Sequence, residues 1–256
     1  MSLRRSTPRI PLAHRLIGEG LVVLALLGWW LLARRLPEFI LPDPVSVARR
    51  LLDLFVTPEF LQHTLASTWR VLVSVVAALL IGGVLAFIAD RVPLFEAVVN
   101  ERIKPVLNSF PSIGWAILAA IWFPPGDFGV IFVETAILIP FCLINIGEGL
   151  RNIDRELLEM GHSFTRRRAR ILWRITLPLL VPYVLAALRI AYGIAWKIAL
   201  VSELLGAPSG LGYLMLRAQT AADSTTFLAT CFAIVAIFAA GERLVIVPLE
   251  RRFAQH

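Results

Sequence analysis

Ionisable side chains lie inside long apolar blocks of this sequence. Glu134 falls in one block, and Arg189, Lys197 and Glu203 fall in the next. A charged group at the centre of a bilayer costs about 2.5–3.5 kcal/mol on insertion scales, so such residues usually line a solute path, relay protons or pair with each other. The chemistry expected here is therefore electrostatic: attraction of a charged solute, proton transfer, or an ion pair between Glu134 and Lys197.

Polar and aromatic residues of the second block share one helix face. With 3.6 residues per turn, Arg189, Tyr192, Trp196 and Glu203 fall within about 60° of one another, and Lys197 lies about 80° from Arg189. One interpretation is that this stripe lines a translocation pathway, with Trp196 and Glu203 nearer the outer end. The other is that it packs helix against helix, while Arg189 and Glu203 reach opposite headgroup regions.

The remaining reactive residues do not form a catalytic constellation. The sequence contains neither a GxxxxGK[ST] phosphate loop nor a GxSxG elbow, and its four histidines form no pair at i, i+4. We therefore expect no catalytic residue, no bound cofactor and no metal on this chain.

The composition points to a membrane as solvent. Hydrophobic residues make up 58% of the 256 residues and charged residues only 17%, and the mean hydropathy is +0.76; a soluble domain is nearer half apolar and a quarter charged. The apolar residues form blocks with no alternation, which predicts spanning helices and excludes a barrel. We predict an all-α membrane domain over residues 20–248 with six spans, at about Gly20–Ala33, Ala66–Ala89, Pro111–Phe123, Phe128–Ile146, Pro178–Leu205 and Phe227–Val247. A surface helix is expected at Val45–Phe55.

The basic residues predict the orientation. With the first residues inside and six crossings, 17 of the 25 Lys and Arg residues fall in cytoplasmic segments, five in outer segments and three within spans. Basic residues hold loops on the cytoplasmic side. Both termini, residues 1–19 and 249–256, are therefore expected in the cytoplasm, and the formal charge of +7 needs no nucleic-acid partner.

The largest predicted cytoplasmic loop, at about 148–176, has the pattern of two short amphipathic helices. Apolar residues recur at helical spacing on both sides of a junction at 162–165, and six arginines surround them from Arg155 to Arg174. Two interpretations are open on physical grounds: an apolar face that docks against another protein, or a basic loop lying on anionic lipid.

The spacing of this loop matches a known motif. The loop resembles the EAA motif of ABC importer permeases, E-A-A-x3-G-x9-I-x-L-P. The matching residues are Glu159-Met160-Gly161-x3-Thr165-x9-Ile175-x-Leu177-Pro178. Thr165 stands where glycine is usual, and a β-branched residue is costly if that position needs a positive φ. We therefore expect the turn at Thr165 to be built differently from that of the family.

The resemblance extends from about residue 40 to the end of the last span. Four further segments resemble, in the same order, segments of the nitrate/sulfonate/taurine group of these permeases. They are ILPDPVSVARRL, QHTLASTWRVL, FPSIGWAILAAIWF and ALRIAYGIAWKIALVSELLGAPSGLGYLM. The resemblance implies a type I importer fold and a multi-pass subunit of a bacterial inner membrane.

The resemblance also implies partners. These are two ATPase subunits that bind ATP and Mg²⁺ and receive the EAA loop, a second copy of the permease, and a periplasmic or lipid-anchored binding protein that delivers a small, anionic solute. An ion-coupled secondary transporter that uses Glu134, Lys197 and Glu203 as a relay is the alternative, although the sequence lacks the internal symmetry typical of that class.

Overall fold

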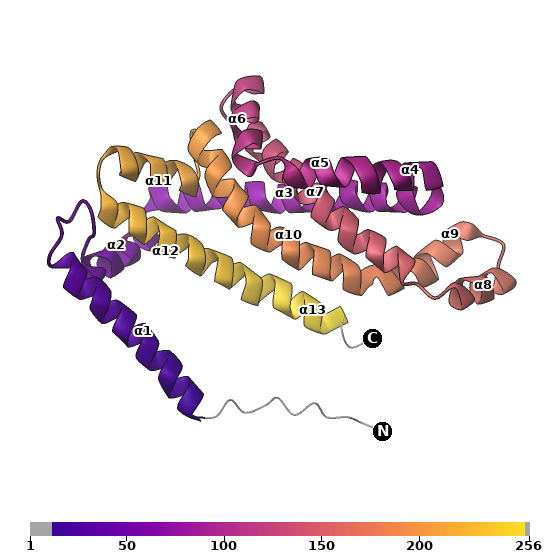
Figure 1. The fold of residues 1–256 in the computed structure, drawn as a ribbon, viewed down its shortest axis with the longest axis horizontal. Coiled ribbons are helices and arrows are strands. Elements are labelled where there is room, and N and C mark those ends of the chain that lie inside the picture. The colour runs from indigo at the N-terminus through magenta and orange to yellow at the C-terminus, as the bar shows by residue number, and fades with distance from the viewer. Residues whose placement is uncertain (1–11, 254–256) are drawn as a thin grey trace.

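The computed structural model describes residues 12–253, and every regular element in that range is a helix (Figure 1). In chain order the elements are α1 (Leu12–Ala33), α2 (Pro44–Val56), α3 (Pro58–Arg91), α4 (Pro93–Val98), the π-helix η1 (Val99–Ile103), α5 (Lys104–Ser109), α6 (Ser112–Trp122), α7 (Asp127–Arg151), α8 (Arg155–Phe164), α9 (Arg168–Ile171), η2 (Leu172–Thr176), α10 (Leu177–Gly206), α11 (Leu211–Thr220), α12 (Ser224–Gly241), η3 (Glu242–Ile246) and α13 (Val247–Phe253). The all-helical prediction is confirmed for the described residues.

Four helical segments within residues 12–253 are long and apolar enough to cross a membrane. They are Pro58–Arg91, Asp127–Arg151, Arg168–Gly206 and Ser224–Phe253, and they contain the second, fourth, fifth and sixth predicted spans. Each exceeds the roughly 20 residues that a bilayer requires. The first predicted span is also helical, but its apolar part, Gly18–Ala33, is shorter.

The third predicted span differs from the structure at its amino end. Its apolar block forms only the 11-residue helix α6, which is too short to cross a bilayer alone. The preceding residues, expected to be a cytoplasmic connector, form α4, η1 and α5, which turn back and lie beside α3 and α7 (Figure 1). Their mixed polarity hid this helix, because Glu101, Arg102 and Lys104 interrupt the apolar run.

Close packing of α3 on α7 forms the centre of the bundle. At Gly82 an added Cβ atom would lie 2.8 Å from the Cβ of Cys142 and 3.0 Å from the carbonyl oxygen of Ile139. Small residues at such crossings let helix backbones approach closely, which is how helices associate where the surrounding lipid is as apolar as their side chains. α10 packs against both α3 and α7 and completes the core.

The two ends of the bundle carry different structures (Figure 1). α8 and α9 lie at one end, which we call the α8 end, and α2 and α11 lie at the other, the α11 end. The predicted surface helix is confirmed as α2, which packs against α12. Its start is fixed by Asp43, whose carboxylate accepts hydrogen bonds from the backbone amides of Val45 and Ser46 at 3.0 and 3.4 Å.

Candidate functional site

The loop between α7 and α10 contains two short helices, as the spacing of its apolar residues predicts. α8 begins after Asp154, whose side chain accepts a hydrogen bond from the Glu156 amide at 2.9 Å. α9 leads into the π-helix η2 and then into α10 without a break, so Ile175, Leu177 and Pro178 belong to one continuous helix. Pro178 cannot donate a backbone hydrogen bond, and the π turn directly before it is an arrangement by which a helix accommodates such a loss.

The turn at Thr165 uses extended backbone. Thr165 has φ −155° and ψ 135°, a β-region conformation that a β-branched residue adopts without strain. Its hydroxyl oxygen accepts a weak hydrogen bond from the Arg167 amide at 3.3 Å. Threonine is therefore compatible with this turn, because the position needs no left-handed conformation.

Gly161 is the point at which α8 contacts the following helix. It is buried, and a Cβ atom added there would lie 2.6 Å from the Cδ1 atom of Ile175 and 3.8 Å from atoms of Ile171. Leu158, on the same side of α8, packs against the apolar cluster at the ends of α3, α7 and α10. One side of α8 is thus anchored to the rest of the chain.

The neighbouring side of α8 presents apolar side chains to the surroundings. Leu157, Met160 and Phe164 are 39%, 53% and 84% exposed, and their spacing of three and four residues places them on one helix face. We call these three residues the α8 apolar face. Glu159 is exposed on a different side of α8. An apolar face outside the bundle, with the neighbouring side of its helix anchored, is suited to docking against another protein.

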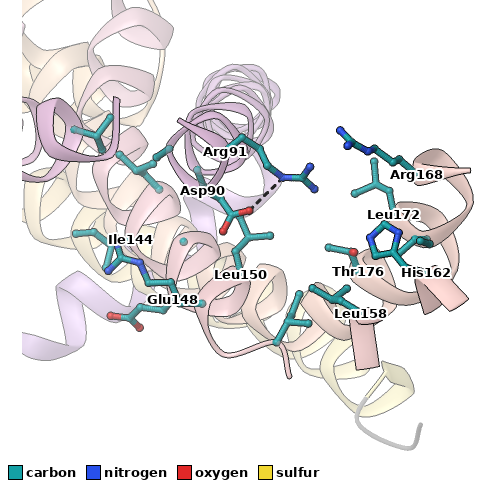
Figure 2. Close-up of a pocket in the computed structure, with 18 residues that line it drawn as sticks. Asp90, Arg91, Ile144, Glu148, Leu150, Leu158, His162, Arg168, Leu172 and Thr176 are labelled. Carbon is teal, nitrogen blue, oxygen red and sulfur yellow. Dashed lines mark ion pairs between the residues drawn. The ribbon is translucent and has the colours of Figure 1, made fainter. Parts of the chain in front are cut away.

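A cavity of about 830 Å³ separates α8 and α9 from the ends of α3 and α7. Arg91 from α3 and Arg168 from α9 point toward each other across it, and Arg91 pairs with Asp90 at 3.4 Å (Figure 2). His162 and Thr176 line the side formed by α8 and η2. The two short helices are therefore attached to the bundle by α7 and α10, and a cavity large enough for water lies between them and α3.

A buried polar network lies at the α11 end of the bundle. Arg70 of α3 is 1% exposed and donates hydrogen bonds to Glu203 at 2.8 Å, to Asp127 at 2.8 Å and to the backbone oxygen of Ser209 at 2.7 Å. Glu203 also accepts hydrogen bonds from the Ser67 hydroxyl at 2.8 Å and from the backbone amide of residue 212 at 2.9 Å. The network joins α3, the start of α7 and the loop after α10.

The sequence reasoning missed the role of Arg70. Its only signal was a third basic residue inside an apolar block, at the carboxyl end of the QHTLASTWRVL segment. A charge this deep in a span requires a partner, but the sequence alone does not identify Glu203 and Asp127 as its partners.

The predicted stripe on α10 faces the interior of the single chain. Glu203, Trp196 and Tyr192 are 0%, 3% and 7% exposed, and the Tyr192 hydroxyl donates to the backbone oxygen of Phe238 at 3.2 Å. This is the arrangement of the helix-packing interpretation.

The charged residues of α10 differ in their surroundings. Arg189 forms ion pairs with Glu242 at 3.0 Å and Glu250 at 3.2 Å, on η3 and α13. Lys197, off the stripe, is exposed. Glu134 is fully buried, and neither of its carboxylate oxygens has a hydrogen-bond partner within the described residues. The structure therefore does not bring Glu134 and Lys197 together as the ion pair considered above.

These features define a class of protein: a helical membrane subunit with a pair of short helices projecting from one end. The chain belongs to the family of binding-protein-dependent transport system inner membrane components, which matches residues 99–247. It is an ABC importer permease of the nitrate/sulfonate/taurine type. Membership of this family of transport components decides against the ion-coupled secondary transporter considered above.

Similar proteins support the same assignment. The taurine transport system permease protein TauC of Escherichia coli K12 is 27% identical, over 97% of this chain and 93% of its own length. The putative aliphatic sulfonates transport permease protein SsuC of the same organism is 31% identical, over 77% of this chain and 73% of its own length. The formylaminopyrimidine transport permease protein ThiX of Halalkalibacterium halodurans is 27% identical, over 80% of this chain and 81% of its own length.

Solved structures share the fold. A chain of a bacterial alginate ABC transporter superposes with a TM-score of 0.59 at 17% identity, over 92% of this chain and 98% of that chain. A chain of the inward-facing methionine transporter MetNI superposes with a TM-score of 0.51 at 16% identity, over 75% and 99%. At these identities the likeness establishes the architecture alone.

Proposed function

We propose that this permease is driven by a separate ATPase subunit that docks on the α8 apolar face. The observation that carries the proposal is the division of α8 into two sides. Gly161 and Leu158 anchor one side to the chain, while Leu157 and Phe164 are exposed on the neighbouring side. A force applied to that face reaches α10 through the contact of Gly161 with Ile175 and through the continuous helix that follows.

The EAA-like residues then have distinct roles. Met160 contributes to the docking face, and Glu159, exposed on another side of α8, would make a polar contact with the ATPase. Gly161 and Ile175 transmit the motion. Thr165 closes the turn between the two short helices, while Leu177 and Pro178 begin the spanning part of α10.

The α8 end is proposed to be cytoplasmic. The positive-inside count supports this orientation, because seven basic residues lie between Arg151 and Arg174. Residues 1–19 and 249–256 would then be cytoplasmic segments flanking a domain of six crossings over 20–248. In this arrangement α1 and the helical segment 93–122 are the two crossings in addition to the four long spans. The membrane is the bacterial inner membrane.

The complete transporter is proposed to contain two copies of this chain, two ATPase subunits that bind ATP and Mg²⁺, and an external binding protein. That binding protein would dock at the α11 end, where α2 and α11 lie (Figure 1). The solved alginate ABC transporter supports such an assembly, since it is in complex with an alginate pentasaccharide-bound periplasmic protein. The pathway would run between the two copies, along the exposed side of α10.

The solute is proposed to be a small anion of the sulfonate type. The relatives named for taurine and aliphatic sulfonates support this class, and so does Lys197 on the exposed side of α10. Tyr192, Trp196 and Glu203 would support that helix from behind, because they are buried in the single chain.

Binding of the ATPase tests the proposal. Phe164→Ser and Leu157→Ser should each weaken binding of the co-expressed ATPase by about 30-fold, the effect of truncating an interface hot spot, without changing the melting temperature of the permease. Ser163→Ala, on the same helix but off the apolar face, is the matched control. Unchanged ATPase affinity in both serine variants would refute docking on this face.

A further inference from the structure

Lys197 is an exposed cation in the middle of a spanning helix. Within the part of the chain that the structure describes, its ammonium group forms neither a hydrogen bond nor an ion pair. Two other basic residues deep within the spans are paired: Arg70 is buried against Glu203 and Asp127, and Arg189 lies between Glu242 and Glu250. Lys197 therefore keeps its charge available, whereas Arg70 and Arg189 do not.

The depth of Lys197 makes contact with lipid tails unfavourable. It lies nine residues before Gly206, the last residue of α10, which is about 13–14 Å along a helix with a rise of 1.5 Å per residue. Half the thickness of a bilayer core is about 15 Å. A lysine near that depth is costly in lipid and normally faces protein or a water-filled path.

The same side of α10 has room for a solute. Gly193, one turn before Lys197, would carry a Cβ atom into space with nothing within 4 Å. Ile190, two turns before Lys197, is 41% exposed. The buried stripe of Tyr192, Trp196 and Glu203 lies to the other side, so the single chain leaves the side with Lys197 uncovered.

We infer that Lys197 is the group that selects anions in the translocation pathway. Its ammonium group would donate hydrogen bonds to the oxygens of a sulfonate or a similar oxyanion as it passes, and would repel cations of the same size. The inference rests on the pathway proposed above, and it adds the residue that determines whether anions or cations are favoured as solutes. A flexible, strongly hydrated ammonium suits transient contact better than a guanidinium fixed by two carboxylates.

A reporter thiol at position 193 tests this role without knowledge of the solute. Gly193→Cys is introduced into the full transporter in membranes, with Cys142 and Cys231 replaced by alanine. Its reaction rates are measured with two water-soluble reagents, an anionic sulfonatoethyl methanethiosulfonate and a cationic trimethylammonioethyl methanethiosulfonate. With Lys197 about 6 Å away along the helix, Lys197→Met should lower the anionic-to-cationic rate ratio about ten-fold, and Lys197→Arg should preserve it.

The controls separate failure of this inference from failure of the pathway. Gln219→Cys on the exposed side of α11 should give a ratio that Lys197→Met leaves unchanged. If Gly193→Cys reacts with neither reagent while Gln219→Cys reacts with both, the proposed pathway along α10 is wrong. If Gly193→Cys reacts but its ratio is the same with lysine and methionine at 197, the pathway stands and anion selection by Lys197 is refuted. Loss of the two-copy assembly in Lys197→Met would likewise overturn it, in favour of an ion pair between copies.

Discussion

The guanidinium of Arg70 donates a 2.8 Å hydrogen bond to the carboxylate of Glu203, and the two side chains are only 1% and 0% exposed. Removing one partner of a buried ion pair leaves an uncompensated charge and typically costs 3–5 kcal/mol. Arg70→Met should therefore lower the unfolding free energy of the permease by about that amount, measured as a large fall in melting temperature in detergent. Asp127, which also pairs with Arg70, is itself an acid and cannot replace the lost cation beside Glu203.

Glu134 provides the matched control for that substitution. It is as deeply buried as Glu203, but neither of its oxygens has a partner in the described chain. Glu134→Gln removes a group that is costly to ionise in this setting, so the melting temperature should stay constant or rise. If Glu134→Gln and Arg70→Met destabilise the permease equally, the loss of unfolding free energy depends on burial alone and not on the hydrogen-bond network.

Two adjacent glycines of α3 should respond differently to alanine. At Gly82 the added Cβ would meet the Cys142 Cβ at 2.8 Å and backbone atoms of α7 at 3.0 Å, whereas at Gly83 the nearest atom is the Cδ1 of Ile146 at 3.5 Å. Overpacking against backbone costs about 1–3 kcal/mol, so Gly82→Ala should be destabilising. Gly83→Ala should be neutral or stabilising by up to about 1 kcal/mol, because alanine favours the helix. Thermal unfolding of the two variants under identical conditions checks the difference, and equal melting temperatures would contradict the close approach of α3 and α7.

The contact of Gly161 with Ile175 predicts a graded effect on coupling. Gly161→Ala meets only the flexible end of Ile175, so a change of rotamer should accommodate it with little loss. Gly161→Leu should push α8 away from the following helix and lower substrate-stimulated ATPase activity of the assembled transporter by about ten-fold or more. Adding Ile175→Ala should restore part of that activity, because it removes the atom in the way. A double variant as impaired as Gly161→Leu alone would show that this contact does not carry the motion.

The ion pairs of Arg189 should contribute less than that of Arg70. Arg189 is 52% exposed at the side chain, and its partners Glu242 and Glu250 are partly exposed. Solvent screens such pairs, whose usual contribution is about 0–1 kcal/mol. Arg189→Met should therefore change the melting temperature far less than Arg70→Met, in a side-by-side thermal denaturation. A loss as large as that of Arg70→Met would mean that the pairs are shielded from water.

Much of the candidate site follows from short-range patterns. The apolar spacing on both sides of residues 162–165 predicts α8 and α9, because amphipathic periodicity is a local property. The match of Glu159, Gly161 and Ile175 to the EAA motif is also a local property, because it depends only on spacing along the chain. The helical segment 93–109 was not predicted, because Arg102 and Lys104 look like connector residues unless the packing of that segment beside α3 is known.

The sequence by itself determined the class of this protein. Long apolar blocks must satisfy their backbone hydrogen bonds within each helix, so composition alone predicts a helical membrane bundle, and the order of its motifs predicts the family. Only the tertiary structure decided which side of α10 faces inward. Periodicity groups Arg189, Tyr192, Trp196 and Glu203 on one face, but a polar stripe can face either protein or a water path. The choice depends on contacts between distant parts of the chain, above all the hydrogen bond from Arg70 to Glu203, which are more than 130 positions apart. Because these contacts bury the stripe, Lys197 is the unpaired charge on the uncovered side of α10 in the described chain.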